Sequence, residues 1–269
     1  MQNTEMTSDL FRSGSVVVTG AGAGIGRATC ELLVREGVSV VGVDLDEGLL
    51  ASLAESTGEK VAPCSGDVTD QEVLVRAADL AETRGPLVGW VNNAANFAAS
   101  SFRDTPLSVM RETLEGNLFA AMTGTQISVQ RFIAAGTPGS IVNLSSVQSN
   151  FPAPNYTAYG LSKTSLEGLT RATAADCGSH RIRANAVAPG GVRSERSQAW
   201  LDSLEPELGK RLGREFEQSH ALGRRGRPDE IGEAIVFLLS PRASWITGAT
   251  LVVDGGRSAW SWDEISAMK

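Results

Sequence analysis

The chain has 269 residues, of which 42% are hydrophobic and 20% charged, a composition typical of globular proteins. Its net charge of -7 and the lack of a broad basic run argue against a nucleic-acid surface. The apolar runs, such as 234–239, are too short to span a bilayer, and the first residues do not resemble a signal peptide. Three scattered cysteines and two histidines suggest neither a disulfide framework nor a metal site. We therefore expect a cytoplasmic protein without membrane, nucleic-acid or metal partners.

Short β-branched runs alternate with longer stretches of helical apolar spacing along the chain. We expect strands at 16–18, 39–43, 60–63, 89–91, 140–144, 181–187 and 250–253. We expect helices at 25–36, 47–56, 70–83, 106–135, 155–178 and 228–239. Continuous apolar strands that alternate with helices are typical of a parallel sheet covered on both faces. The sequence predicts an α/β fold with a doubly wound, seven-stranded parallel sheet in a single domain, 1–269.

The segment from about 192 to 226 departs from this alternation. It is polar, charged and helix-prone, and it follows a strand without an obvious sheet partner, so we expect a substrate lid. The tail, 257–269, carries Trp260 and Trp262. These side chains either seal the pocket of a neighbouring subunit or cover their own domain.

A glycine-rich loop, Thr-Gly-Ala-Gly-Ala-Gly-Ile-Gly, covers residues 19–26 between the first strand and the first helix. Gly20, Gly24 and Gly26 have the spacing Gly-x-x-x-Gly-x-Gly, and no Gly-Lys-Ser/Thr follows, which excludes a Walker loop. Glycines permit a tight turn, so that amides at the helix N-terminus can meet a pyrophosphate. A purely structural glycine turn is the alternative.

Asp44 ends the second expected strand, about twenty residues beyond this loop. In a nucleotide-binding fold, an acid at this place accepts hydrogen bonds from the adenosine ribose and repels a 2′-phosphate. Neither Ala23 nor Leu45 supplies a compensating cation. These residues favour NAD over NADP as the cofactor.

Tyr159 and Lys163 are four residues apart on an expected helix, where such positions share one face. Bringing a phenol pKa from about 10 to near 7 takes roughly 4 kcal/mol, which matches one charge at about 4 Å in an effective dielectric of about 20. Ser145, at the end of an apolar run, could then hold a substrate oxygen while the tyrosine exchanges a proton with it. The spacing alone is also common in surface helices.

The motifs together resemble the short-chain dehydrogenase/reductase family along essentially the whole chain. The matching motifs are the glycine loop, Asp67-Val68, Asn92-Asn93-Ala94, Asn117, Ser145, Tyr159-x-x-x-Lys163, Pro189-Gly190, the run 223–231, Thr247-Gly248 and Asp254-Gly255-Gly256. The resemblance implies a Rossmann-type fold and an enzyme that uses a nicotinamide cofactor.

The resemblance also implies a role for each matched residue. Tyr159 would be the general acid/base, Ser145 would orient the reacting oxygen, and Lys163 would bind the nicotinamide ribose and lower the tyrosine pKa. Asn117 would position the lysine through a water. Besides Tyr159 and Lys163, the implied cofactor-binding residues are Gly20, Gly24, Ile25, Gly26, Asp44, Asp67, Val68, Asn93, Ala94, Pro189, Gly190, Val192 and Ser194.

Three positions depart from the pattern of the family. Ala95 replaces a usual glycine, Ser194 replaces a usual threonine, and Gly191 leaves more room beside the nicotinamide than a bulky residue would. The residues expected to contact substrate are Asn96, Val147, Gln148, Asn155, Gly191 and Trp200. Their mixed aromatic and amide character suits a cyclic, sugar-like or hydrophobic secondary alcohol.

Three functions are compatible with these patterns. The first is an NAD-dependent enzyme that interconverts a small secondary alcohol and a ketone. The second is a reductase of 3-oxoacyl groups on acyl carrier protein, which would normally favour NADPH. The third is a dinucleotide-sensing or scaffold protein without turnover. In the family that the chain resembles, helices such as 106–135 and 155–178 pair across subunits, so we expect a homotetramer.

Overall fold

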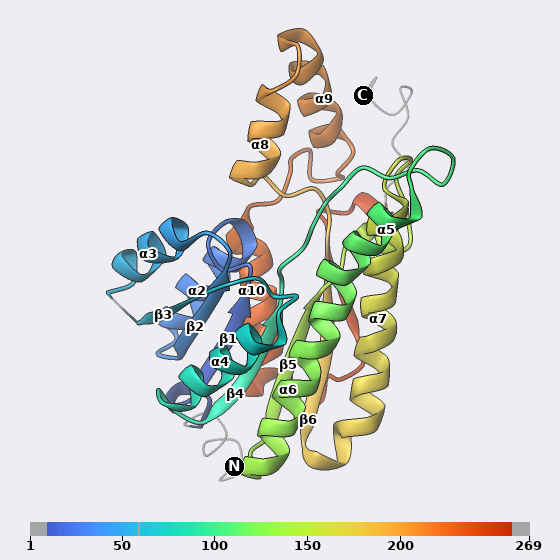
Figure 1. Ribbon diagram of the computed structural model, residues 1–269. Helices are drawn as coiled ribbons and strands as arrows, with labels where there is room; N and C mark the ends of the chain where they lie inside the picture. Colours follow the sequence, from blue (N-terminus) through green and yellow to red (C-terminus); the bar gives the residue numbers. More distant parts are fainter. Residues whose placement is uncertain (1–9, 59, 260–269) are drawn as a thin grey trace.

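The computed structural model describes residues 10–58 and 60–259 (Figure 1). Its strands are β1 (Ser15–Thr19), β2 (Ser39–Asp44), β3 (Val61–Ser65), β4 (Leu87–Asn92), β5 (Gly139–Leu144), β6 (Ile182–Pro189) and β7 (Thr250–Val253). All six strand pairs are parallel, and the described residues form one sheet of order β3-β2-β1-β4-β5-β6-β7. The chain reverses direction across the sheet between β1 and β4, where ligands bind in such folds.

The helices of the body are α2 (Gly24–Arg35), α3 (Glu47–Ser56), α4 (Gln71–Glu82), α5 (Leu107–Leu114), α6 (Ala120–Ala135), α7 (Thr157–Cys177) and α10 (Pro228–Leu239). Alternating residues of β1 point to two separate apolar clusters, because side chains of a strand alternate between its faces. Val16 and Val18 pack with α2 and α10, whereas Val17 packs with α4 and α6. The predicted parallel sheet with helices on both faces is therefore confirmed.

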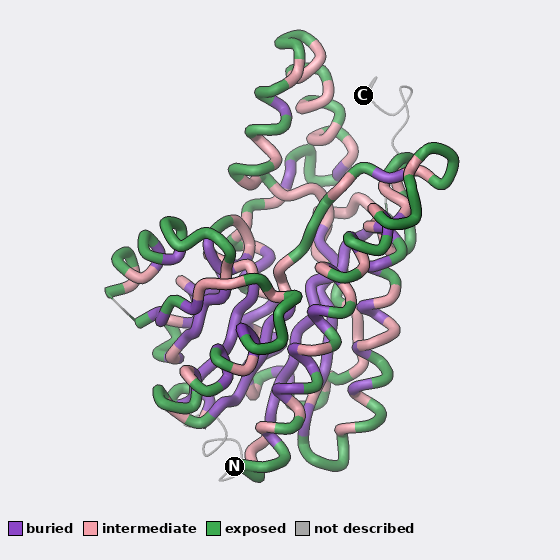
Figure 2. The backbone as a smooth tube through the Cα atoms, viewed as in Figure 1, coloured by how far each residue is buried: buried purple, intermediate pink, exposed green. Residues whose placement is uncertain are grey.

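The segment expected to be a lid, which we continue to call the lid, contains α8 (Glu195–Asp202) and α9 (Pro206–Gln218), which project from the body above the carboxyl ends of the strands (Figure 1). Burial is concentrated in the sheet and is sparse in these two helices (Figure 2). Leu201 is the one buried residue of α8, and α9 has none. These two helices therefore bury few apolar side chains, and their role as a lid stays a prediction.

Two sequence expectations need comment. The single helix expected over 106–135 is divided by a π-helical turn, η1 (Glu115–Phe119). Part of the expected C-terminal tail, with Trp260 and Trp262, lies outside the described residues. Within the described ranges, no helix is long and apolar enough to cross a membrane.

Candidate active site

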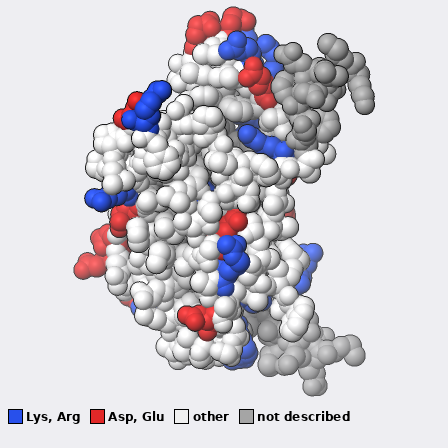
Figure 3. Space-filling view, turned by 90° about the vertical axis from the view of Figure 1, so that its right-hand side faces the viewer, with Lys and Arg blue, Asp and Glu red and all other residues white. Residues whose placement is uncertain are grey.

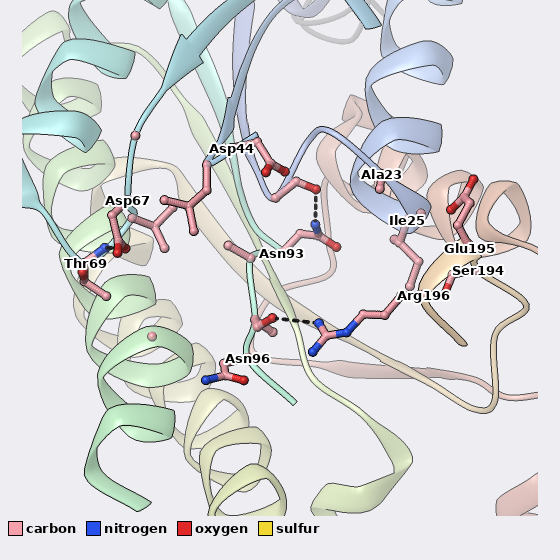
Figure 4. A pocket seen from close by; sticks show the side chains of 18 of the residues that line it. Ala23, Ile25, Asp44, Asp67, Thr69, Asn93, Asn96, Ser194, Glu195 and Arg196 are labelled. Atoms are coloured by element: carbon pink, nitrogen blue, oxygen red, sulfur yellow. Dashed lines mark hydrogen bonds between the residues drawn. The ribbon is translucent and has the colours of Figure 1, made fainter. Parts of the chain in front are cut away.

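A cavity of about 650 Å³ opens where the carboxyl ends of the central strands meet α8 (Figure 4). Its walls are the glycine loop, the ends of β2 and β3, the segment after β4, and the first residues of the lid. Ten residues predicted to bind the cofactor line it: Gly20, Gly24, Ile25, Asp44, Asp67, Val68, Asn93, Ala94, Val192 and Ser194. The other residues predicted to bind the cofactor are not among the lining residues: Gly26, Tyr159, Lys163, Pro189 and Gly190.

The glycine loop has the backbone geometry that a close ligand requires. Gly20 and Gly24 have φ angles of 63° and 54°, which L side chains rarely adopt. A Cβ on Gly26 would collide with the carbonyl oxygen of Gly20, so the turn needs a glycine there. The N-cap of α2, Ala23, offers no side-chain acceptor to the first N–H groups of the helix. The loop therefore fits the pyrophosphate of a dinucleotide.

Asn93 and Thr19 brace the loop from below. The Asn93 side-chain amide donates to the carbonyl oxygens of Thr19 and Gly20 at 2.8 and 3.0 Å (Figure 4). The Thr19 hydroxyl accepts from the backbone amides of Asn93 and Ala94. Because these bonds engage both N–H groups of the Asn93 side chain, we infer that this side chain mainly holds the shape of the loop.

Asp44 lies at the wall of the cavity with its carboxylate already oriented. One oxygen accepts from the Gly22 amide at 2.9 Å and the other from the Asp46 amide at 3.1 Å. Ala23 and Leu45 line the same cavity and carry no charge. An adenosine ribose could therefore meet the free lone pairs of Asp44.

Tyr159 and Lys163 share one face of α7, as predicted. The Lys163 Nζ lies 5.4 Å from the centroid of the Tyr159 ring and donates to the carbonyl oxygen of Leu144 at 2.7 Å. Burial lowers the pKa of Lys163 to about 8. Burial also raises the pKa of Tyr159 above its usual value, while hydrogen bonding with Ser146 and the charge of Arg196 lower it. Desolvation is thus the largest influence on the Tyr159 pKa, and the lowering of this pKa by Lys163 stays a prediction.

The serine expected beside Tyr159 requires a correction. The Ser145 hydroxyl donates to the Lys163 carbonyl oxygen and to Glu167 Oε1, each at 3.0 Å, and is therefore directed into the protein. The next residue, Ser146, lies close enough to Tyr159 for its hydroxyl to lower the pKa of the phenol. The Ser145 backbone amide donates a hydrogen bond to the Val187 carbonyl oxygen and so continues the ladder between β5 and β6. Consecutive side chains of extended backbone point to opposite sides, so the side chains of Ser145 and Ser146 diverge. The structure therefore favours Ser146 over the predicted Ser145 as the serine beside Tyr159.

Asn117 lies in the π-helical turn η1, a feature frequent at functional sites. Its side-chain oxygen accepts from the Asn96 amide, and its nitrogen donates to the Asn96 carbonyl oxygen at 2.8 Å and to Ser162 Oγ at 3.2 Å. Asn96 itself lines the cavity. Asn117 thus connects the cavity wall to the helix of Tyr159 and Lys163.

An aromatic cluster covers Tyr159. The Phe97 ring stacks on Tyr156 at 4.4 Å between centroids and meets Tyr159 edge-on at 4.6 Å. Phe97 remains 39% exposed, so it can also form a wall for a substrate.

The residues expected to contact substrate are not all equally placed for that role. Val147 is buried, and Asn155 is exposed with its carbonyl oxygen bonded to the Ser100 amide. Gly191 is not a source of free room, since a Cβ there would approach His220 Cε1 to 2.9 Å. The backbone amide of Gln148 donates to the Ser146 hydroxyl. The side-chain oxygen of Gln148 is buried without a hydrogen-bond partner. Trp200 packs against Phe216 in the lid at 6.0 Å between ring centroids.

Arg196 is a cavity residue that sequence reasoning missed. It reaches from α8 toward the carbonyl oxygen of Ala95 at 3.5 Å, across the cavity (Figure 4). It is the one cation among the described lining residues, which also include Asp44, Asp67, Glu112 and Glu195. No motif marks this position; its place at the start of an expected lid was the only available signal.

Comparison with known proteins agrees with this geometry. The family profile described as Enoyl-(Acyl carrier protein) reductase matches residues 20–258. The chain is 36% identical over 250 residues to 2,5-dichloro-2,5-cyclohexadiene-1,4-diol dehydrogenase of Sphingobium indicum, covering 91% of this chain and 97% of that one. It is 34% identical over 246 residues to carbonyl reductase [NADPH] 2 of Sus scrofa, covering 91% and 97%.

Solved structures include a similar protein, the ligand-free aldohexose dehydrogenase of Thermoplasma acidophilum. It superposes with a TM-score of 0.85 at 30% identity and covers 96% of this chain and 98% of its own. Dehydrogenases and reductases of this family act on alcohols and ketones with a nicotinamide dinucleotide. The chain belongs to the short-chain dehydrogenase/reductase family and is an oxidoreductase that interconverts alcohols and ketones.

Proposed function

We propose that the protein interconverts a small secondary alcohol and its ketone with NAD(H), and that Tyr159 transfers the proton. The observation that carries this proposal is that Lys163 Nζ lies 5.4 Å from the centroid of the Tyr159 ring on one face of α7, with Ser146 beside Tyr159. A bound nicotinamide would accept or donate the hydride. The chain itself then needs only to hold the substrate oxygen and to move one proton.

Ser146 and Tyr159 divide that work. The Ser146 hydroxyl can donate to the substrate oxygen and fix its position, while the Tyr159 hydroxyl exchanges the proton with the same oxygen. Lys163 would donate to the nicotinamide ribose and would favour the phenolate through its charge. Asn117 acts as a positioning residue, because it holds the Asn96 backbone beside the cavity and Ser162 of the catalytic helix.

Asp44 supports NAD as the preferred cofactor. A 2′-phosphate beside this carboxylate would lose about 1 to 4 kcal/mol for each unit charge, depending on the local dielectric. Arg196, the one cation among the described residues that line the cavity, donates to the Ala95 carbonyl oxygen and makes no ion pair with Asp44. Because one relative bears NADPH in its name, family membership does not decide the choice, and the preference rests on Asp44.

The expected substrate is a neutral cyclic or polyhydroxylated alcohol. Phe97 and Tyr156 offer an apolar wall beside Tyr159, and Gln148 offers a buried amide oxygen without a partner. The names of two relatives, a cyclohexadiene-diol dehydrogenase and an aldohexose dehydrogenase, agree with this class. Trp200, 43% exposed, and Phe216 can cover such a substrate when the lid closes.

A homotetramer is proposed on the basis of uncovered apolar side chains on α5, α6 and α7 and the turn between them. Leu107, Phe119, Met122, Ile133 and Leu161 are each between 42 and 61% exposed. The face turned to the viewer in Figure 3 carries few charges, whereas charges of both signs gather over the lid at its top. An apolar, weakly charged face of this kind suits a subunit interface.

Turnover of a panel of alcohols and ketones tests the proposal, with NAD and NADP in the oxidative direction and NADH and NADPH in the reductive direction. The proposal predicts activity on cyclic or sugar-like secondary alcohols with a higher kcat/KM for NAD. Turnover with NADP(H) alone would show that Asp44 does not set the preference. Dinucleotide binding without turnover of any compound would favour a sensing protein.

A further inference from the structure

A second cavity, of about 510 Å³, lies in the lid between α8 and α9 and shares no lining residue with the first. Four cations line it, and only two acids do, so its charge is positive. The cations are Arg193, Lys210, Arg214 and Arg225, and the acids are Asp202 and Glu217. A net positive cavity is unexpected in a chain whose net charge is -7.

Arg225 is the buried member of this group. It is only 8% exposed, and its Nε is buried without a hydrogen-bond partner. Among the described residues, its side chain makes one hydrogen bond, from Nη2 to Gln198 Oε1 at 3.3 Å. Burial and the charge of Arg193 lower the pKa of Arg225, whereas Glu217 raises it. A buried guanidinium with an unsatisfied donor is costly, and an anionic acceptor would remove that cost.

The other charged groups leave room for such an acceptor. Lys210 is paired with Glu207 at 2.9 Å, and Asp202 accepts from the Gln198 amide at 2.9 Å. The side chains of Arg193 and Arg214 make no hydrogen bond or ion pair with another described residue. Two exposed guanidinium groups therefore border the cavity that the buried Arg225 also lines.

We propose that this lid cavity binds the oxyanion group, phosphate or carboxylate, of a small metabolite through Arg193, Arg214 and Arg225. Planar guanidinium groups donate pairs of N–H bonds that match both kinds of oxyanion. The cavity volume is within the range of small-molecule sites.

Binding there acts on the dinucleotide cavity through the backbone. Residues 191–193 and 226 form a parallel bridge, in which the Arg193 amide donates to the Gly226 carbonyl oxygen at 2.8 Å and the Gly226 amide to the Gly191 carbonyl oxygen at 2.9 Å. Val192 and Ser194, which flank Arg193, line the first cavity. An oxyanion that holds Arg193 and Arg225 together fixes this wall and so tightens dinucleotide binding, and the coupling is reciprocal.

The test measures binding of inorganic phosphate, and separately of acetate, by calorimetry to the full chain saturated with its preferred dinucleotide. Ionic strength is kept constant with chloride. Because the dinucleotide occupies the first cavity, binding of phosphate to that cavity cannot contribute to the measured heat. Arg214→Gln and Arg211→Gln form a matched pair, because both residues are exposed on α9 but only Arg214 lines the cavity. Arg225→Met removes the buried guanidinium.

We expect saturable binding of at least one anion to the wild type and to Arg211→Gln. Affinity should fall at least roughly tenfold in Arg214→Gln and further in Arg225→Met, since charge-assisted hydrogen bonds are lost. The anion that binds more tightly identifies the oxyanion. Absence of binding by both anions, or equal losses in Arg211→Gln and Arg214→Gln, overturns the site. If Arg225→Met does not fold, the matched pair decides alone. In a separate titration of the dinucleotide, unchanged affinity with and without the bound anion would refute the coupling.

Discussion

Lys163 is predicted to destabilise the folded protein while it serves the reaction. The side chain is 2% exposed, and burial lowers its pKa from 10.5 to about 8. Each unit of pKa corresponds to about 1.4 kcal/mol, so the charged lysine costs the folded state about 3 kcal/mol at pH 7. Above pH 8 the folded state loses the proton first, and the cost falls to about 1.4 kcal/mol at pH 9.5.

The Lys163→Met variant removes this cost but leaves the Leu144 carbonyl oxygen without its 2.7 Å donor. That loss is worth about 1 to 3 kcal/mol, so the variant should be as stable as the wild type at pH 7 or up to about 2 kcal/mol more stable. The pH dependence is the sharper signal. From pH 7 to 9.5 the wild type should gain about 2 kcal/mol relative to the variant.

Urea unfolding of both proteins without dinucleotide, at several pH values and one protein concentration, measures this difference. Groups common to both proteins cancel in the comparison. A Lys163→Arg variant is the matched control, because it keeps a charge that does not titrate in this range. A difference between wild type and Lys163→Met that stays constant from pH 7 to 9.5 would refute the reasoning, since the buried lysine would then have an ordinary pKa.

Three further predictions concern single residues near the cavity. Ser146→Ala should lower kcat roughly 100-fold or more, because it removes the donor to the substrate oxygen. Ser145→Ala should reduce the free energy of unfolding by roughly 1 to 3 kcal/mol with little change in kcat. Steady-state kinetics and urea unfolding distinguish the two variants, and the reverse pattern would assign the substrate oxygen to Ser145. Asp44→Ser should shift the ratio of kcat/KM from NAD toward NADP by on the order of 10-fold to 1,000-fold, and an unchanged ratio would contradict the role of the carboxylate. His220 accepts from the Gly191 amide at 2.9 Å, and burial lowers its pKa below 6.5, so this contribution to stability is complete above pH 6.5 and is lost at lower pH. The stability advantage of the wild type over His220→Phe should therefore shrink between pH 7 and 5, and a constant difference in urea unfolding would count against it.

The sheet was predictable because its signals are local. Continuous apolar runs and helical spacing identified all seven strands and six helical stretches, and the helices at 47–56 and 228–239 agree with α3 and α10 to the residue. The glycine loop and Asp44 were also predictable, since backbone geometry demands glycine at residues 20, 24 and 26 and the acid ends a strand.

Features that depend on side-chain direction were not predictable. Ser145 and Ser146 follow the same strand, and only the backbone beyond Leu144 decides which hydroxyl faces Tyr159. The π-helical turn at Asn117 was also not predicted from the sequence.

Other features of the site depend on contacts between residues far apart in the sequence and were not predicted. His220 lies against Gly191 and explains why a glycine stands there. Arg196 and Arg225 gain their positions from the packing of the lid, which carries no periodic signal strong enough to predict.

The most direct test of the central claim compares the wild type with Tyr159→Phe in one experiment that records both dinucleotide binding and hydride transfer. The phenylalanine retains the ring that contacts Phe97 at 4.6 Å and removes only the hydroxyl. We predict dinucleotide affinity within about threefold of the wild type and a loss of turnover of roughly 100-fold or more, the scale of general acid–base catalysis. Turnover that persists at the wild-type rate in Tyr159→Phe would contradict the assignment of Tyr159 as the proton donor and acceptor.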